Sequence, residues 1–240
     1  MSYEGPKPKY YKKYYHIDSI ATYKDVPGWC NDAEDIYKMM VDRAKDGDHF
    51  VEIGTLLGQS ASMMGTYINE SNKNIKFDSI DLFWTIEPHI RAGVEEGHHP
   101  PSFLKYIEDC YKEYNYQKYQ GIIDIIQHSF HRLGCFDKVN LITCDEQFAH
   151  KIYDDESLQF VWIDGDHGEG VVFKDLENFW PKIKMGGFIG GDDLKDVKKD
   201  LEKFVGMYNI KDIHQTYTPN GFLIQKFQHN TEPKNLTSLI

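Results

Sequence analysis

Three segments of the chain share one form, an apolar run of strand length that ends abruptly in glycine or acidic residues. They cover residues 49–60, 160–167 and 187–194. Such runs are typical of strands buried on both faces of a parallel sheet, and open α/β sheets bind their ligands beyond the C-terminal ends of the strands. Because parallel strands end at one edge of the sheet, we expect the glycines and carboxylates of these segments to lie close together.

The rest of the chain continues this alternation. We expect strands at 49–53, 76–82, 138–143, 159–164 and 187–191, and helices at about 31–44, 60–68, 171–180 and 195–206. Two final strands, 208–216 and 221–227, flank the turn Thr218-Pro-Asn-Gly221 and predict an antiparallel hairpin. The predicted fold is therefore α/β, a Rossmann-like doubly wound sheet of seven strands that ends in a C-terminal hairpin.

The length of 240 residues fits one domain with room for insertions. Residues 1–30 are polar and rich in tyrosine, and we expect an N-terminal arm or lid. Residues 84–136 are too long for a simple crossover, which predicts a helical cap inserted over the ligand end of the sheet. The polar tail, residues 228–240, is expected to be flexible.

Composition narrows the range of partners. The formal net charge of -11 and the pI of about 5.4 argue against binding to nucleic acid or to an anionic membrane surface. The four cysteines are scattered without a Cys-x-x-Cys pair, which argues against a zinc site or a disulfide framework. No apolar signal region or membrane-spanning run is visible, so we expect a cytoplasmic protein, and a homo-oligomer stays open.

The segment Gly54-Thr-Leu-Leu-Gly58-Gln-Ser60 is a glycine loop between a strand and a helix. A phosphate-binding P-loop needs a different glycine spacing and a lysine, and the dinucleotide fingerprint needs glycine where Leu56 stands. The remaining pattern, Glu-x-Gly-x-x-x-Gly-x-Ser, resembles motif I of the class I S-adenosylmethionine-dependent methyltransferases. By this resemblance the cofactor-binding residues of the loop are Glu52, Gly54, Thr55, Gly58 and Ser60.

Two further acids follow strands in positions where that family contacts its cofactor. Asp81 ends the next predicted strand, and the resemblance implies that its carboxylate accepts both ribose hydroxyl protons. Asp145 ends the third strand, where the family often places a polar contact to the adenine. A helix cap is the alternative for a single aspartate at such a position.

The carboxylates of Asp164, Asp192 and Asp193 come from two strands that should be neighbours. Three hard oxygen ligands suit Mg2+ better than zinc. Asp193 as a simple N-cap of the following helix is the alternative. His167 can reach the rim of the same site as a general base, or it can be a loop histidine bonded to backbone.

Asp-Gly-Asp-His at 164–167 and Gly-Gly-Asp-Asp at 190–193 resemble the group that contains the macrocin-type sugar O-methyltransferases and the cephalosporin-hydroxylase-like proteins. The resemblance implies metal ligands at Asp164, Asp192 and Asp193, with His167 as the base. We therefore expect a Mg2+-dependent O-methyltransferase that uses S-adenosylmethionine and acts on a hydroxyl of a sugar or glycosylated small molecule. A catechol or phenolic O-methyltransferase and a non-catalytic cofactor-binding scaffold are the alternatives.

Overall fold

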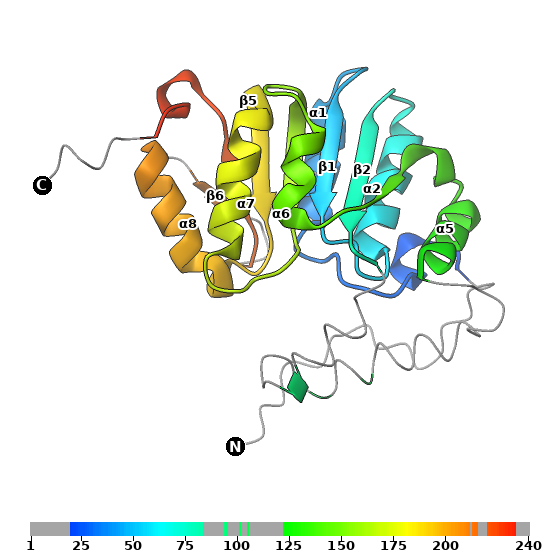
Figure 1. The fold of residues 1–240 in the computed structure, drawn as a ribbon. Coiled ribbons are helices and arrows are strands. Elements are labelled where there is room, and N and C mark those ends of the chain that lie inside the picture. The colour runs from blue at the N-terminus through cyan, green and yellow to red at the C-terminus, as the bar shows by residue number, and fades with distance from the viewer. Residues whose placement is uncertain are drawn as a thin grey trace, which may run out of the picture.

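A computed structural model describes residues 20–83, 94, 95, 101, 105, 122–211, 213–215 and 220–233. Within them the chain forms one mixed sheet of seven strands in the order β3-β2-β1-β4-β5-β7-β6. Strands β1 to β5 pair in parallel, whereas β7 is antiparallel to both β5 and β6 (Figure 1). The α/β class is confirmed, and the strand order reverses between β1 and β4.

The strands lie close to their predicted positions. Their bounds are β1 His49–Ile53, β2 Lys76–Asp81, β3 Asn140–Thr143, β4 Leu158–Ile163, β5 Ile183–Gly191, β6 Ile213–Gln215 and β7 Phe222–Gln225. Strand β5 begins four residues before its predicted start at 187, because residue Ile183 already pairs with Leu158 across a register shift. Of the turn predicted at 218–221, residues 218 and 219 lie outside the described part of the chain, as do 216 and 217 before it.

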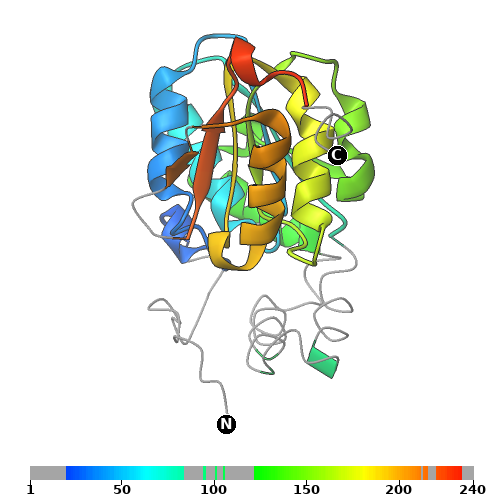
Figure 2. The ribbon, with the colours of Figure 1, turned by 90° about the vertical axis from the view of Figure 1, so that its left-hand side faces the viewer.

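Helices cover both faces of the sheet (Figure 2). One face packs against α1 Glu34–Arg43, α2 Gln59–Ser71 and α5 Ile122–Leu133, and the other against α6 Glu146–Ala149, α7 Val171–Phe179 and α8 Leu194–Tyr208. Short 3-10 helices are η2 Tyr23–Asp25, η3 Phe136–Lys138, η4 His150–Ile152, η5 Trp180–Lys182 and η6 Gln228–Asn230. No helix of the described residues has the length and apolar character to cross a membrane.

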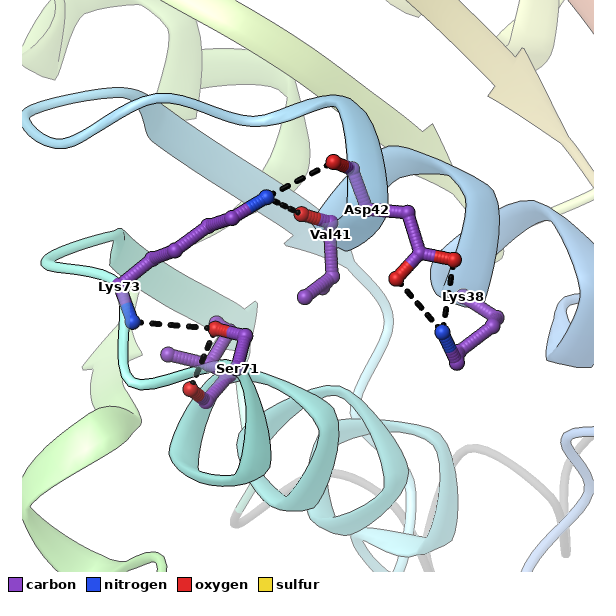
Figure 3. A network of polar contacts seen from close by, with 6 residues as sticks. Lys38, Val41, Asp42, Ser71 and Lys73 are labelled. Carbon is purple, nitrogen blue, oxygen red and sulfur yellow. Dashed lines mark hydrogen bonds and ion pairs between the residues drawn. The ribbon is translucent and has the colours of Figure 1, made fainter.

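Helix α1 packs against the sheet through one face, and its two ends differ in how they are capped. The 3.6-residue period of the sequence places Ala33, Ile36, Met40 and Ala44 on one face, and all four are buried. The sequence also predicts Asn31 or Asp32 as the N-cap, which is wrong, because the N-cap is Ala33 and no side chain caps the helix. At its other end the ammonium group of Lys73 donates to the carbonyl oxygens of Val41 and Asp42, both at 2.7 Å (Figure 3). This cation adds a donor to two carbonyl oxygens in the last turn of the helix, of which that of Val41 also accepts from the backbone nitrogen of Ala44 at 3.3 Å.

The insertion predicted at 84–136 is corrected in its last part. Helix α5 lies there, and its residues Ile122, Ile125, Ile126 and Phe130 are buried in the same core cluster as α2. It is the crossover between β2 and β3 that a parallel sheet requires. Apart from four isolated positions, residues 84–121 lie outside the described residues, so the predicted cap remains a prediction.

The two ends of the chain also pack more than predicted. In the arm, Ile20 and Val26 are buried, and the backbone oxygen of Val26 accepts from the side-chain amide of Gln59 at 2.7 Å. In the tail, Asn230 is 1% exposed, and its carbonyl accepts from the indole nitrogen of Trp180 at 3.1 Å. Both ranges, 20–30 and 228–230, therefore contribute buried residues to the domain, whereas 1–19 and 234–240 lie outside the described residues.

Candidate functional site

The site is built on one row of residues at the C-terminal edge of the sheet. Ile53 pairs with Ile80 of β2 on one side and with Ile163 of β4 on the other, and Ile163 pairs with Gly191 of β5. The residue that follows each of these is Gly54 after Ile53, Asp81 after Ile80, Asp164 after Ile163 and Asp192 after Gly191. The sheet thus brings the glycine loop and three of the predicted acids to the same edge, beside the point where the strand order reverses.

The two loop glycines are required by contacts within the protein. Gly54 has φ +91°, and a Cβ added there would lie 1.9 Å from the backbone oxygen of Asp164. Gly58 is the left-handed N-cap of α2, and a Cβ there would lie 2.9 Å from Ile126. The space that a Cβ would need at these two positions is thus already occupied by the residue after β4 and by helix α5. Glycine at these positions lets β1, β4 and α5 approach closely.

Asp81 fixes the shape of the glycine loop. Its Oδ2 accepts from the backbone nitrogens of Thr55 and Leu56, both at 2.9 Å, and its Oδ1 accepts from the backbone nitrogen of Phe83 at 2.9 Å. A carboxylate has about four acceptor sites, so about one is left for a ligand. The predicted two-hydroxyl grip on a ribose therefore does not fit this arrangement. Asp81 can accept one hydroxyl while it holds the loop.

Glu52 lies beneath the loop. Its carboxylate is 0% exposed and accepts from the hydroxyl of Tyr37 at 2.7 Å and from that of Ser79 at 2.6 Å. Burial raises the pKa of Glu52, although hydrogen bonds from Ser79, Ser60 and Tyr37 oppose this shift. In this structure the Glu52 carboxylate contacts protein groups, and its predicted contact with a cofactor remains a prediction. The carboxylate ties β1 to its neighbours.

Thr55 and Ser60 share this supporting position. Thr55 is 2% exposed, and its hydroxyl lies 2.6 Å from that of Ser79, while Ser60 is 4% exposed in the first turn of α2. Their side chains therefore face the interior. Any contact that these two residues make with a cofactor must come from the backbone of the loop.

The third strand ends at a capped helix. Asp145 is the N-cap of α6, and its Oδ1 accepts from the backbone nitrogen of Gln147 at 3.0 Å. Its other oxygen accepts from the side-chain amide of Gln147 at 3.0 Å. The helix-cap alternative thus describes Asp145 in this structure, and the adenine contact remains a prediction.

His167 and Asp193 form a hydrogen-bonded pair. The Nδ1 atom of His167 lies 3.0 Å from Oδ2 of Asp193. Because a carboxylate only accepts, Nδ1 carries the hydrogen, and in the neutral ring Nε2 is the basic nitrogen. Nε2 is buried and has no hydrogen-bond partner among the described residues. Burial lowers the pKa of His167, but the hydrogen bond and charge of Asp193 outweigh it, so the pKa is raised.

Asp193 stands at the N-cap position of α8, yet it does not cap the helix. Its backbone is left-handed, with φ 51°, and its side chain makes no cap hydrogen bond. The hydrogen bond from His167 lowers the pKa of Asp193 below its usual range. The simple N-cap alternative for Asp193 is therefore not what this side chain does.

Asp164 and Asp192 are two acids whose pKa values are both raised. Burial and the Asp192 carboxylate raise the pKa of Asp164 well above its usual range. Burial, Asp32 and Asp193 raise the pKa of Asp192 to about 7. Even so, the described residues contain no group of three or more His, Cys, Asp or Glu side chains arranged to hold a metal ion. One reason is local, because Asp193 points both oxygens at protein donors, His167 and Asn220.

Sequence reasoning missed three residues that the fold brings to this edge. Asp32 and Asn220 lie beside the acids of β5, and the side-chain amide of Asn220 lies 3.4 Å from Oδ2 of Asp32. Glu146 accepts from the backbone nitrogen of Asp166 at 3.2 Å, and burial raises its pKa to about 7. The sequence predicts Asp32 only as a candidate helix N-cap and Asn220 only as part of a turn. Local sequence carried no signal that they meet the acids of β5.

A buried acid lies behind the loop that carries His167. Asp175 of α7 is 1% exposed, and its Oδ2 has no hydrogen-bond partner among the described residues. Burial, followed by the charges of Glu146 and Asp166, raises its pKa to about 8. A carboxyl in such a place is held in its protonated form near neutral pH.

This acid predicts a pH dependence of stability. The pKa of Asp175 is about 8 in the folded protein and 3.8 for a free aspartate. Folding therefore binds a proton between these pH values, and stability falls as the pH rises through them. We expect Asp175→Asn to unfold at the same denaturant concentration as wild type at pH 3.8 or below. At pH 8 the variant should be more stable by a few kcal/mol, on the order expected for such a pKa shift.

Asp78 provides a control of opposite sign. Its carboxylate accepts from Tyr153 and from Asn140 and pairs with His49 at 2.8 Å, and although burial opposes the shift, these contacts lower its pKa. Its contribution to stability is fully present above pH 3.8, the pKa of a free aspartate. It is lost as the pH falls through the lower pKa of the folded state. Asp78→Asn should therefore be less stable than wild type at neutral pH. An Asp175→Asn protein that is less stable than wild type at pH 8 would contradict the assignment.

The sheet order, with its antiparallel strand β7 between β5 and β6, and the glycine loop after β1 define a Rossmann-like methyltransferase fold. A family model described as a methyltransferase domain matches residues 51–194, which is more than half of the chain. The chain belongs to this methyltransferase family. No curated protein sequence matches the chain.

Solved structures share the fold at low sequence identity. A caffeoyl-CoA O-methyltransferase candidate from Staphylococcus aureus is 12% identical with a TM-score of 0.54, and the match covers 84% of this chain and 86% of that one. An S-adenosylmethionine-dependent O-methyltransferase from Thermotoga maritima is 11% identical with a TM-score of 0.50, covering 81% and 64%. An rRNA methylase from Streptococcus thermophilus is 10% identical with a TM-score of 0.50, covering 82% and 98%. Two of these names give different acceptors, caffeoyl-CoA and rRNA, so the shared fold does not select one.

Proposed function

We propose that the protein is an S-adenosylmethionine-dependent O-methyltransferase whose acceptor is a hydroxyl of a sugar or glycosylated small molecule. One observation supports a hydroxyl oxygen as the atom that accepts the methyl group. The Nε2 atom of His167 is buried without a described partner, while Nδ1 is held 3.0 Å from Asp193. A hydroxyl loses its proton only at high pH, so its methylation needs such a base.

The residues of the chain divide the chemistry as follows. The loop at 54–58, held by Asp81, offers backbone groups to a cofactor, and bound S-adenosylmethionine supplies a methyl group on an electron-poor sulfonium. The ring of His167 accepts the hydroxyl proton at Nε2. Asp193 then stabilises the positive charge that appears on the ring. Positioning and exclusion of water at the strand ends supply much of the remaining rate.

A Mg2+ ion is part of the proposal, and its support is electrostatic. Burial and the charge of Asp192 raise the pKa of Asp164, and burial and the charges of Asp32 and Asp193 raise the pKa of Asp192 to about 7. A divalent cation would relieve this repulsion and would lower the pKa of a bound acceptor hydroxyl. The donor set suits Mg2+ in kind, but Asp193 would have to turn an oxygen away from its present partners to complete a three-carboxylate site. We therefore assign no step of the reaction to the ion.

The remaining expectations about partners stand as part of this proposal. The acceptor is a small molecule or glycan rather than nucleic acid or a membrane surface, because the chain carries a formal net charge of -11. The three cysteines that the structure describes, Cys30, Cys135 and Cys144, are free thiols, which suits a reducing cytoplasm. A homo-oligomer remains open.

Isothermal titration with S-adenosylhomocysteine tests the proposal. We expect the metal-free protein to bind it, and we expect a separate Mg2+ heat that is lost when Asp164 and Asp192 are both changed to asparagine. The control changes Asp154 and Asp155 to asparagine, because these acids are exposed and lie outside the row of strand ends. This control should keep both heats.

The outcomes separate the parts of the proposal. No binding of S-adenosylhomocysteine by any form would refute the cofactor assignment. Binding without a Mg2+ heat in wild type would remove the metal and leave the methyltransferase. A methyl-transfer screen of sugars, glycosides and catechols with the wild-type protein then tests the acceptor, and transfer only to catechols would overturn the sugar assignment.

A further inference from the structure

Asn220 stands where the hairpin strand β7 begins, far from the acids in sequence but beside them in the fold. Its side-chain nitrogen lies 2.9 Å from Oδ1 of Asp193, 3.4 Å from Oδ2 of Asp32 and 3.5 Å from Oδ1 of Asp192. All three neighbours are acceptors, so the orientation of the amide follows from the contacts: the NH2 group must face them. The shortest of these bonds goes to Asp193.

Asp193 is thereby held from both sides. One oxygen accepts from Asn220, and the other faces Nδ1 of His167 at 3.0 Å. A carboxylate fixed at both oxygens cannot rotate about its terminal bond without losing one of the two. The backbone oxygen of Asn220 also accepts from the backbone nitrogen of Leu194 at 2.6 Å, so the same residue satisfies a free N–H in the first turn of α8.

We propose that Asn220 is a positioning residue for His167: its amide holds Asp193 in the orientation that keeps the hydrogen on Nδ1 and the lone pair on Nε2. The kinetic part of this inference depends on the proposed methyl transfer, whereas the structural part does not. The amide adds two donors and no charge among three carboxylates. Aspartate in its place would have the same size but would offer these acids only another acceptor.

The test compares variants that keep or remove the donor. Asn220→Asp and Asn220→Ala remove it, and Asn220→Gln keeps an amide. The control is Gln225→Glu, the same amide-to-acid change at the other end of β7, where the amide donates to the backbone oxygen of Gly186 at 2.9 Å. Thermal unfolding of every variant shows which ones fold, and only folded variants enter the comparison.

The first measurement is made on the ligand-free and metal-free protein. Long-range 1H–15N correlation of the His167 ring at a fixed alkaline pH reports which nitrogen carries the hydrogen, and His167→Gln identifies the signals. We expect a single tautomer with hydrogen on Nδ1 in wild type, Asn220→Gln and Gln225→Glu. The Asp and Ala variants should show a mixture or a displaced equilibrium.

The second measurement is turnover. With an acceptor from the screen, kcat should fall roughly 10–100-fold in Asn220→Asp and Asn220→Ala, the range typical of residues that orient a functional group. Affinity for S-adenosylhomocysteine should be retained in all variants, since the hydrogen bonds of Asn220 go to Leu194 and to acids outside the glycine loop. Partial recovery of kcat in Asn220→Gln would identify the amide donor as the cause.

Two results would overturn the inference. One is an unchanged His167 tautomer in folded Asn220→Asp and Asn220→Ala, and the other is an equal loss of kcat in Gln225→Glu. A lost tautomer preference without methyl transfer by any form would support the positioning of His167 and would count only against the proposed function.

Discussion

Changing His167 to glutamine is expected to lower kcat by about 10²–10⁴-fold, the usual contribution of a general base. Glutamine keeps a side-chain N–H that can donate to Asp193, but it has no basic nitrogen. The loss should therefore appear in turnover, while the affinity for S-adenosylhomocysteine, measured by titration, stays close to that of wild type. Initial rates at saturating donor and acceptor give the comparison.

His229→Ala is the matched control, because His229 is exposed and stacks only on Phe227 at the far end of β7. It should leave kcat unchanged. If His167→Gln retained wild-type turnover, His167 would be a structural loop histidine and the base would have to be sought elsewhere. If both kcat and cofactor affinity collapsed, the residue would be holding the loop rather than moving a proton.

Gly54→Ala is expected to abolish S-adenosylhomocysteine binding and to destabilise the fold by several kcal/mol. The new Cβ would lie 1.9 Å from the backbone oxygen of Asp164, so strands β1 and β4 would have to separate at the edge where the site is built. The positive φ of +91° adds roughly 1–2 kcal/mol of strain for a non-glycine residue. Urea unfolding and titration measure the two effects.

Gly47→Ala is the control that has the backbone strain without a collision. Gly47 has φ +87°, and a Cβ there would meet nothing within 4 Å, so only the strain of about 1–2 kcal/mol should remain. Cofactor binding should survive in this control. Equal destabilisation of the two variants would show that the close approach of β1 and β4 is not what requires glycine at position 54.

The elements of the fold follow from local sequence. The predicted strands β1, β2 and β4 agree with the observed bounds to within one residue at each end, and β1 and β4 are mostly apolar because both faces of the sheet are covered. The 3.6-residue period of the sequence places Val172, Leu176, Phe179 and Trp180 on one face, and all four are at most 1% exposed. Helix α5 was missed as a crossover, since a long segment before it hid the βα rhythm.

Part of the site was also readable. The rule that parallel strands end at one edge correctly brought Gly54, Asp81, Asp164 and Asp192 together, as the pairing of Ile53 with Ile80 and Ile163 requires. Sequence could assign these residues to an edge. It could not say which of their atoms already accept hydrogen bonds within the protein, as both oxygens of Asp81 do.

Sequence by itself thus determined the order of strands and helices and the edge at which the acids gather, since both depend on short-range apolar periodicity. Only the tertiary structure decided the partners of those acids. Asn220 and Asp193 are 27 residues apart and Asn220 and Asp32 are 188 apart, yet each pair lies within hydrogen-bond distance. Such contacts depend on how β7 folds back beside β5 and on where the chain before α1 packs. Neither can be predicted from the residues that neighbour these acids in the sequence.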